Sequence, residues 1–239
     1  MMKITIAYIE EPPFGWTNHD GSPTGADVEL AGVVVRALGY TKIDVQRVTF
    51  EELLPGVITG RWDLNVPIFV TAERSTSVDF SAPVWAAGDG FLVLAGNPKG
   101  LDSYKAVATR GDVRLGVVSG TVQQAAALNV GVQDARIISF ARQDDAVDAL
   151  LAGRIDAYAA TALGNRASAD RLGHDRVNAV AHVVGASAPL GAFSFNKNNT
   201  ALRDAVNAEL RRYLGSADHR QRMAKYGFTR DEIDPVLNR

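Results

Sequence analysis

The sequence predicts an α/β protein with two lobes of βαβαβ type, joined by a two-stranded hinge and separated by a ligand cleft. Three observations predict this fold class. The same order of strand and helix patterns occurs twice. The segments 60–64 and 153–157, GRWDL and GRIDA, fall at the same step of that order. Two apolar runs, 90–95 and 191–195, separate the halves. These observations favour two similar lobes over one continuous sheet.

The first lobe begins with an alternating pattern that is typical of a short buried strand. A loop rich in proline and glycine follows, and the next helix is expected to stop at Gly39. In order, we expect a strand at 3–9, the loop at 12–25, a helix at 26–38, a strand at 43–49, a helix at 51–59 and a strand at 62–66.

The second lobe repeats this order after the first apolar run. We expect a strand at 113–118, a turn at 119–121, a helix through residue 127, a strand at 135–140, a helix at 143–152 and a strand from residue 155. If the apolar runs are the two crossings, residues 1–91 and 193–239 form the first lobe and residues 92–192 the second. The C-terminal helices then pack on the first lobe through an apolar stripe of Leu202, Val206, Leu210 and Tyr213.

Composition excludes several classes of function. The 239 residues are 46% hydrophobic and 22% charged, as in folded globular proteins. No cysteine is present, which excludes disulfides, thiolate zinc sites, iron–sulfur clusters and cysteine nucleophiles. The net charge is −2, without runs of like charge, so we expect no nucleic-acid partner. Phosphate-loop, dinucleotide, nucleophile-elbow and zinc-protease motifs are absent from the sequence, and we expect no cofactor.

Neither the histidines nor the acidic clusters predict a metal site. The four histidines have no partner at ligand spacing, and we interpret them as surface or loop residues: His19, His174, His182 and His219. An acidic group falls in the first turns of a helix, where carboxylates complement the helix dipole: Asp144, Asp145 and Asp148. The sequence also contains no apolar stretch long enough to span a membrane, and we expect it to be cytosolic or already trimmed of a signal peptide.

Candidate ligand residues gather where the strands of the first lobe end. Glu11 and Phe14 lie in a loop that two prolines stiffen, directly after the first strand. Phe50 is expected to end the second strand, and Phe69 to follow the third. Ligands of open α/β folds bind at this edge of a sheet. An ordinary turn with core aromatics is the alternative, but three aromatics at successive strand ends favour a lined pocket.

Two further segments can hold an anion. Arg74 is expected at a helix start just beyond Phe69, where its planar guanidinium can bind a carboxylate through two parallel hydrogen bonds. A salt bridge to Glu73 or Asp79 is the alternative. In the second lobe, the segment Ser119-Gly120-Thr121 places backbone amides and a hydroxyl at a helix N-terminus. An ordinary helix cap explains this segment almost as well.

One pair of motifs carries a resemblance to a known family. Residues 71–74, TAER, followed by 78–83, VDFSAP, resemble the T-x-E-R and V-x-F-S-x-P pattern of the polar amino-acid solute-binding proteins that serve ABC importers. Segments 11–14, 25–30, 116–121 and 225–228 fit that family in the same order. The resemblance implies the type II periplasmic binding fold, a periplasmic or extracellular monomer with its signal peptide removed, and an ABC permease as partner.

The family resemblance also implies roles for particular residues. Arg74, three residues after Thr71 in the motif, would bind a ligand carboxylate. Thr121 and the neighbouring amides, with Gly120, would cap this carboxylate from the other lobe, and Phe14 or Phe50 would flank the ligand.

Two departures from the family pattern indicate a particular branch. Thr161 stands where family members that bind α-amino acids usually carry an acid for the ammonium group, and Pro67-Ile68-Phe69 replaces small polar residues before T-x-E-R. Together with EPPF at 11–14 and DAYAATAL at 156–163, these features resemble the ectoine- and hydroxyectoine-binding branch. That resemblance implies a compact zwitterion, held by Glu11 at its ring N–H groups, by aromatic faces through cation–π contacts, and by Arg74 at its carboxylate.

The ligand-binding residues expected from these arguments are Glu11, Phe14, Phe50, Phe69, Thr71, Arg74, Gly120, Thr121 and Thr161. Two alternatives remain open. One is a polar amino-acid-binding protein or sensor domain of the same fold. The other is a lyase resembling cyclohexadienyl dehydratase, in which Glu11 would be a general acid with a pKa raised by an aromatic pocket. We expect a binding protein rather than an enzyme, because no second acid–base candidate accompanies Glu11.

Overall fold

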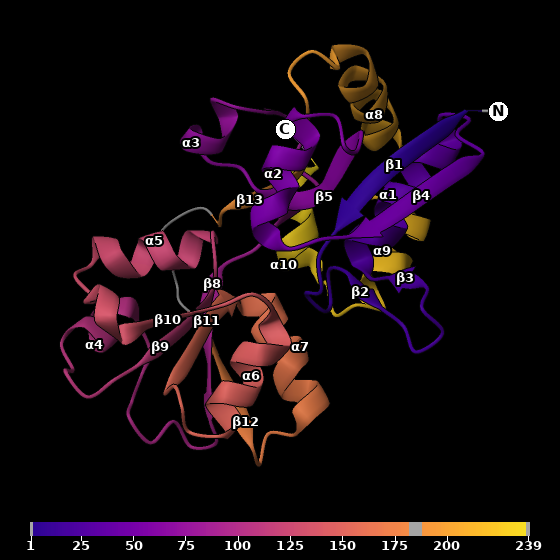
Figure 1. The fold of residues 1–239 in the computed structure, drawn as a ribbon. Helices are drawn as coiled ribbons and strands as arrows, with labels where there is room; N and C mark the ends of the chain where they lie inside the picture. Colours follow the sequence, from indigo (N-terminus) through magenta and orange to yellow (C-terminus); the bar gives the residue numbers. More distant parts are fainter. Residues whose placement is uncertain (1, 182–187, 238–239) are drawn as a thin grey trace. The chain divides into compact units, whose positions relative to one another are not determined.

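A computed structural model of the chain describes residues 2–181 and 188–237, which form two units (Figure 1). One unit consists of Met1–Ala87 and Pro189–Arg239, and the other of Gly88–Ala188. The boundaries expected after residues 91 and 192 lie inside strands β8 (Asp89–Leu94) and β13 (Leu190–Phe195). The whole of β8 pairs with strands of the second unit, and the whole of β13 with strands of the first, so the chain passes between units before each strand.

The first unit contains a mixed sheet whose central part is parallel. Strands β4 (Lys42–Arg47), β1 (Lys3–Tyr8) and β5 (Leu64–Phe69) lie side by side in that order. Strand β13 then pairs antiparallel with β5, with β6 (Asp79–Phe80) and with β7 (Trp85–Ala86). A separate short ribbon consists of β2 (Trp16–Thr17) and β3 (Pro23–Thr24). The carboxyl ends of the three parallel strands therefore meet at one edge of this sheet.

The helices of the first unit come from both ends of the chain. They are α1 (Ala26–Ala37), α2 (Phe50–Ile58), α3 (Ala72–Ser75), α8 (Thr200–Tyr213), α9 (Ala217–Ala224), α10 (Arg230–Ile233) and the 3-10 helix η2 (Asp234–Val236). Helix α2 packs through Leu53 and Val57 into an apolar cluster that includes Ile9 of the loop after β1. Helix α8 buries Leu202, Val206 and Leu210 and contacts α1, which confirms that the C-terminal helices return to the first unit.

The second unit repeats the strand order of the first. Strands β10 (Ile137–Phe140), β9 (Leu115–Val118) and β11 (Ala157–Thr161) are parallel neighbours, and β8 pairs antiparallel with β11 and with β12 (Val177–Ala181). Its helices are α4 (Tyr104–Ala108), α5 (Val122–Asn129), the 3-10 helix η1 (Asp134–Arg136), α6 (Gln143–Leu151) and α7 (Ala162–Leu172). Alternate residues of β8, β9 and β11 pack with α4 and α5 into one core cluster, and α6 and α7 also contact these strands.

The repeated GRWDL and GRIDA segments play the same part in both units. The backbone amide of Asp63 donates to the carbonyl of Thr5 at 2.9 Å, and its carboxylate accepts from the amide of Thr5 at 2.7 Å. Asp156 makes the same two contacts with Arg114, both at 2.8 Å. In each unit this aspartate ties the beginning of the third parallel strand to the beginning of the first. The sequence echo is therefore a structural repeat.

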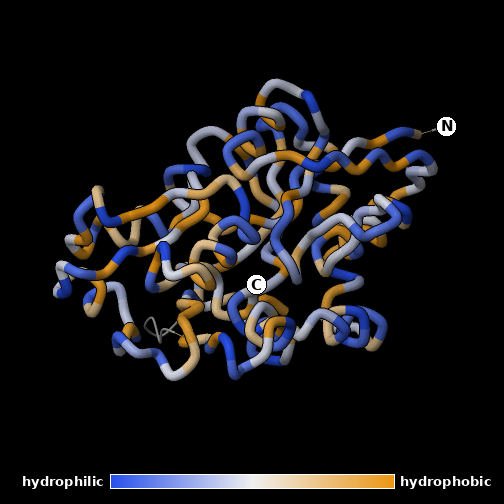
Figure 2. Tube along the Cα trace, turned by 60° about the horizontal axis from the view of Figure 1, so that its bottom comes forward, coloured by the Kyte–Doolittle hydropathy of each residue, from blue (hydrophilic) through white to orange (hydrophobic). Residues whose placement is uncertain are grey.

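Hydropathy along the chain follows the strand geometry. In Figure 2 the N-terminal strand alternates between apolar and hydrophilic colours, because successive residues of a strand point to opposite faces of the sheet. Ile4 and Ile6 of this strand are almost completely buried. None of the helices within residues 2–181 and 188–237 combines the length and the apolar character needed to cross a bilayer.

The loop after β1 is held by the beginning of α1. The first amides of this helix donate to the loop, that of Ala26 to the carbonyl of Pro13 at 3.0 Å and that of Asp27 to the carbonyl of Phe14 at 2.9 Å. The helix cap, Gly25, has φ +119°, and a Cβ atom there would lie 2.4 Å from the carbonyl oxygen of Phe14. Only glycine permits this close approach, so the loop position depends on Gly25.

We expect Gly25→Ala to destabilise the protein by about 3 kcal/mol, because the methyl group adds a backbone clash to an unfavourable φ. Gly21→Ala is the matched control, since Gly21 also has a positive φ, of +82°, but no atom lies within 4 Å of its added Cβ. The control should lose only about 1 kcal/mol. Urea unfolding of the three proteins measures both values, and equal losses would contradict the clash.

Candidate functional site

Glu11 lies in a tight turn at the carboxyl edge of the first sheet. Its amide donates to the carbonyl of Gly15 at 2.7 Å, and its own carbonyl accepts from Phe14 at 2.9 Å and from Gly15 at 3.2 Å. The side chain is half-buried, and burial raises the pKa of its carboxyl group to about 7. Glu11 therefore changes charge near neutral pH, whereas an exposed glutamate is ionised there.

A second carboxyl group, that of Asp27, lies buried in the first turn of α1. Its Oδ1 accepts a hydrogen bond from the indole Nε1 of Trp85 at 3.0 Å, whereas its Oδ2 has no partner within the described residues. Burial raises the pKa of Asp27 well above its usual range, and the charge of Glu11 raises it further. The sequence analysis did not select Asp27, because an acid that opens a helix is also expected from the helix dipole.

Trp85 joins two of the predicted aromatic residues. Its ring centroid lies 5.4 Å from that of Phe14 and 5.4 Å from that of Phe69, and Phe14 also packs edge-on against Phe228 at 5.8 Å. Phe14 and Phe69 retain 5% and 9% exposure, so most of each ring packs against protein. Sequence reasoning missed Trp85, because Trp85 follows the VDFSAP motif, whereas the site residues expected in this part of the chain all come before that motif.

Arg74 lies between Phe50 and the end of the third parallel strand. Its Nη1 donates to the carbonyl of Phe69 at 2.8 Å, and its guanidinium carbon lies 5.2 Å from the ring centroid of Phe50. Burial lowers the pKa of Arg74, and the nearby Glu73 opposes this shift. The alternative partner Asp79 forms an ion pair with Arg203 instead. The structure therefore brings together Phe50, Phe69 and Arg74.

One expectation about Phe50 was wrong. Strand β4 ends at Arg47, and Phe50 is the first residue of α2, not the end of the strand. The reason is local: Thr49 and Glu52 form a capping box that begins the helix. This T-x-x-E signal is visible in the sequence.

Thr71 is the N-cap of the short helix α3. Its hydroxyl accepts from the backbone amide of Arg74 at 3.1 Å. The cap therefore fixes the backbone of Arg74, while Phe50 and the carbonyl of Phe69 position its side chain.

In the second unit, Thr121 precedes α5 at the carboxyl edge of the sheet. Its hydroxyl donates to the carbonyl of Val118 at 2.7 Å, and within the described second unit it makes no side-chain cap bond to the helix. Gly120 has φ +77°, which allows the turn between β9 and α5. The amides in the first turn of α5 are thus not capped by the Thr121 side chain.

Thr161 is the last residue of β11 and the N-cap of α7. Its hydroxyl accepts from the amide of Gly164 at 3.0 Å, and the residue is 4% exposed. The structure therefore places Thr161 at the same edge of the second sheet as Thr121, in a capping position.

No group of three His, Cys, Asp or Glu residues in the described ranges could hold a metal ion. The interpretation of the histidines as surface or loop residues is wrong for His219, which is fully buried in α9 and accepts a hydrogen bond from the amide of Gly215 at 3.1 Å. Burial lowers its pKa to about 4, so it is neutral at pH 7. His182 lies outside the described residues.

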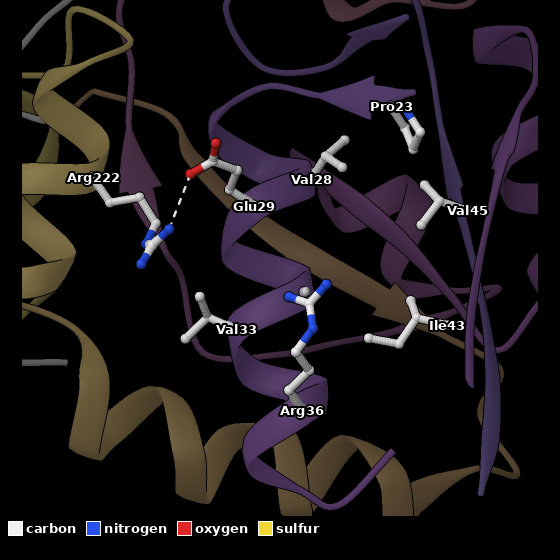
Figure 3. A pocket seen from close by; sticks show the side chains of 9 residues that line it. Pro23, Val28, Glu29, Val33, Arg36, Ile43, Val45 and Arg222 are labelled. Carbon is white, nitrogen blue, oxygen red and sulfur yellow. Dashed lines mark hydrogen bonds and ion pairs between the residues drawn. The ribbon is translucent and has the colours of Figure 1, made fainter. Parts of the chain in front are cut away.

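A pocket of about 310 Å³ occurs elsewhere in the first unit, between α1 and the edge strand β4 (Figure 3). Its walls include Val28, Val33 and Val45, and at its rim Arg222 pairs with Glu29 at 3.2 Å. None of the predicted ligand residues lines this pocket.

Comparison with known proteins connects both units to one family. The model of the bacterial extracellular solute-binding proteins, family 3, matches residues 4–229. A probable amino-acid ABC transporter periplasmic-binding protein of Sinorhizobium fredii is 32% identical over 242 residues, covering 98% of this chain and 79% of that protein. The arginine-binding protein ArgT of Corynebacterium glutamicum is 26% identical, covering 95% of this chain and 74% of that protein.

Among solved structures, the crystal structure of EhuB in complex with hydroxyectoine has a TM-score of 0.89 and 28% sequence identity. The match covers 98% of this chain and 94% of that chain, and the shared fold is the type II periplasmic binding fold. The family match sets aside the lyase alternative. The chain therefore belongs to the bacterial extracellular solute-binding proteins of family 3, and it is a periplasmic or extracellular binding protein for ABC import.

Proposed function

We propose that the solute is a small zwitterion of the ectoine or hydroxyectoine type. The observation that carries this proposal is the grouping of Phe50, Phe69 and Arg74 at the carboxyl edge of the first sheet, where the Glu11 loop also lies. A guanidinium held between a carbonyl and an aromatic ring is positioned to donate hydrogen bonds to a ligand carboxylate. The likeness to the hydroxyectoine complex supports the same class of solute.

The cationic part of the solute would be held by Glu11 and by aromatic faces. A delocalised amidinium spreads its charge over a ring, which matches a cation–π contact worth roughly 0.5 to 2 kcal/mol. Glu11 would accept hydrogen bonds from the ring N–H groups of the solute. Trp85 would hold the Phe69 ring in place through the edge-on contact between the two rings. A compact ring with adjacent carboxylate and cation fits this set of groups better than a long charged side chain.

The second unit would contribute the other half of the contacts. We propose that Thr121, with the amides of Gly120 and of the first turn of α5, caps the ligand carboxylate, because amides at a helix N-terminus favour an anion. Thr71 and Thr161 would contribute through the backbone segments that they cap. Closure of the two units around the solute would then present the protein, as a monomer, to the permease of its importer.

A polar amino acid is the second candidate solute. The relatives from Sinorhizobium fredii and Corynebacterium glutamicum carry amino-acid and arginine binding in their names, which favours this class. An α-amino acid also combines a carboxylate with a cationic nitrogen, so Arg74 and Glu11 would serve the same two charges.

A calorimetric titration separates these candidates. The protein is unfolded and refolded to remove bound solute, then titrated with ectoine, hydroxyectoine, glutamine and arginine. We expect micromolar or tighter binding of ectoine or hydroxyectoine and none of the amino acids. Binding of glutamine or arginine alone would overturn the ectoine proposal and leave the amino-acid candidate.

Arg74→Lys should weaken solute binding by about tenfold or more, since lysine keeps the charge but loses the second hydrogen bond of the fork. Arg61→Lys is the matched control, because the Arg61 guanidinium also stacks on an aromatic ring, that of Trp62 at 4.9 Å, and Arg61 is exposed. The control should bind as the unaltered protein does. Equal affinities of both variants, measured by calorimetry, would show that Arg74 does not bind the carboxylate.

Solute binding should weaken as the pH falls below 7. Burial raises the pKa of Glu11 to about 7, so protonation below that pH removes the negative charge that the cation needs. The affinity should fall by up to about tenfold for each pH unit below 7. Calorimetry between pH 5.5 and 8.5 measures this slope, and Glu11→Gln should bind weakly with no slope. A pH profile unchanged by Glu11→Gln would exclude Glu11 as its source.

A further inference from the structure

The pocket between α1 and β4 has no role in the function proposed so far. Its volume of about 310 Å³ is at the lower end of the range for pockets that hold small molecules (Figure 3). All of its lining residues belong to the first unit, and none of them is a predicted ligand residue. The pocket is therefore separate from the candidate site at the sheet edge.

The walls of this pocket are mostly apolar. Val28 and Val33 of α1 and Ile43 and Val45 of β4 line it, together with Pro23 of β3. Ile43 and Val45 are two positions apart in the strand, so both side chains point to the same face of the sheet. Val33, Ile43 and Val45 are only half-buried, so apolar surface remains for a ligand to cover.

A guanidinium group lies against these apolar walls. Arg36, in the last turn of α1, lines the pocket, and Figure 3 shows its side chain turned back along the helix toward Val28. Helical side chains lean toward the helix N-terminus, which explains this direction. Gly32, one turn earlier, leaves room for the guanidinium, because a Cβ atom there would lie 2.8 Å from Nη1 of Arg36.

The acidic residue of the pocket is already paired. Glu29 is the only acid that lines the pocket within residues 2–181 and 188–237. Its Oε2 pairs with Arg222 at 3.2 Å, and its Oε1 accepts a hydrogen bond from the hydroxyl of Tyr226. The Arg36 side chain forms no hydrogen bond or ion pair with any residue of these two ranges. Arg36 therefore gives the pocket a positive charge without a carboxylate partner.

We propose that this pocket binds a compact aliphatic carboxylate. The inference goes beyond the proposed function and does not rest on it. The planar fork of the Arg36 guanidinium matches the two oxygens of a carboxylate, and the aliphatic body would cover the exposed parts of Val33, Ile43 and Val45. A neutral apolar molecule would leave the guanidinium without a partner, and a cation would be repelled by it.

The test is an NMR titration of the isotope-labelled protein with isocaproate, in the absence and in the presence of excess ectoine. We expect shifts of the backbone amides of Gly32, Val33 and Val45, with a dissociation constant of about 1 mM or below. Isocaproamide, a neutral analogue of the same size, should bind about fivefold more weakly or worse. Excess ectoine should leave the affinity for isocaproate unchanged.

Two substitutions test the guanidinium itself. Arg36→Gln should weaken isocaproate binding by about fivefold or more, since it removes the charge. Arg211→Gln is the matched control and should bind normally, because Arg211 is also exposed in the last turn of a helix, α8, but outside the pocket. Gly32→Ala keeps the charge but displaces the guanidinium, so affinity should fall, whereas the unfolding temperature should not.

The opposite results overturn the proposal. Equal binding of isocaproamide and isocaproate, or equal affinities of Arg36→Gln and Arg211→Gln, would show that no carboxylate pairs with Arg36. Unchanged affinity of Gly32→Ala would contradict a carboxylate held above Gly32. Loss of isocaproate binding in excess ectoine would assign the carboxylate to the solute site. Absence of isocaproate binding overturns this second site alone and leaves the proposed function standing.

Discussion

The hydrogen bond between the Trp85 indole and the buried Asp27 carboxyl group is the interaction on which the first unit's candidate site depends. It joins β7 to the first turn of α1, over a sequence separation of 58 residues. The same turn of α1 holds the carbonyls of Pro13 and Phe14 through its amides. The Trp85 ring meanwhile packs against Phe14 and Phe69, contacts worth about 0.5 to 1.5 kcal/mol each beyond their burial. An indole N–H buried without a hydrogen-bond partner would cost about 1 to 3 kcal/mol. The bond to Asp27 therefore stabilises the buried position of Trp85 and, with it, the rings that pack against Trp85.

Burial of two carboxyl groups at the same sheet edge has a chemical consequence. Glu11 and Asp27 both have raised pKa values, because burial disfavours the charged form of each, and the negative charge of Glu11 raises the pKa of Asp27 further. Such a site gains most from a ligand that brings a positive charge, since the cation compensates the cost of ionising Glu11. Arg74, at the same edge, supplies the opposite charge. Under the proposed function, the first unit would therefore supply partners for both ends of a zwitterion.

The two units share a framework but differ at the edges that bear their candidate site residues. In both, an aspartate three residues after the glycine that stops a helix, Asp63 or Asp156, joins the first and third parallel strands. The edge of the first sheet carries aromatic rings, a guanidinium and carboxyl groups. The edge of the second sheet carries the amides of α5, hydroxyl groups and the carboxylate of Asp89. A common scaffold thus presents two different sets of groups.

The sequence by itself determined the order of strands and helices, because short-range rules govern it. Gly39, Gly60 and Gly153 have positive φ angles just after helices, where glycine alone avoids strain. The motif at 71–74 and the loop at 11–14 likewise indicated the family and the edge where Arg74 and Glu11 lie. Tertiary structure alone decided that Trp85 supports Phe14 and Phe69, that Asp27 is buried beside it, and that Asp89 pairs with Thr161. These contacts join residues far apart in the chain, and neither periodicity nor capping signals specify which distant side chains meet.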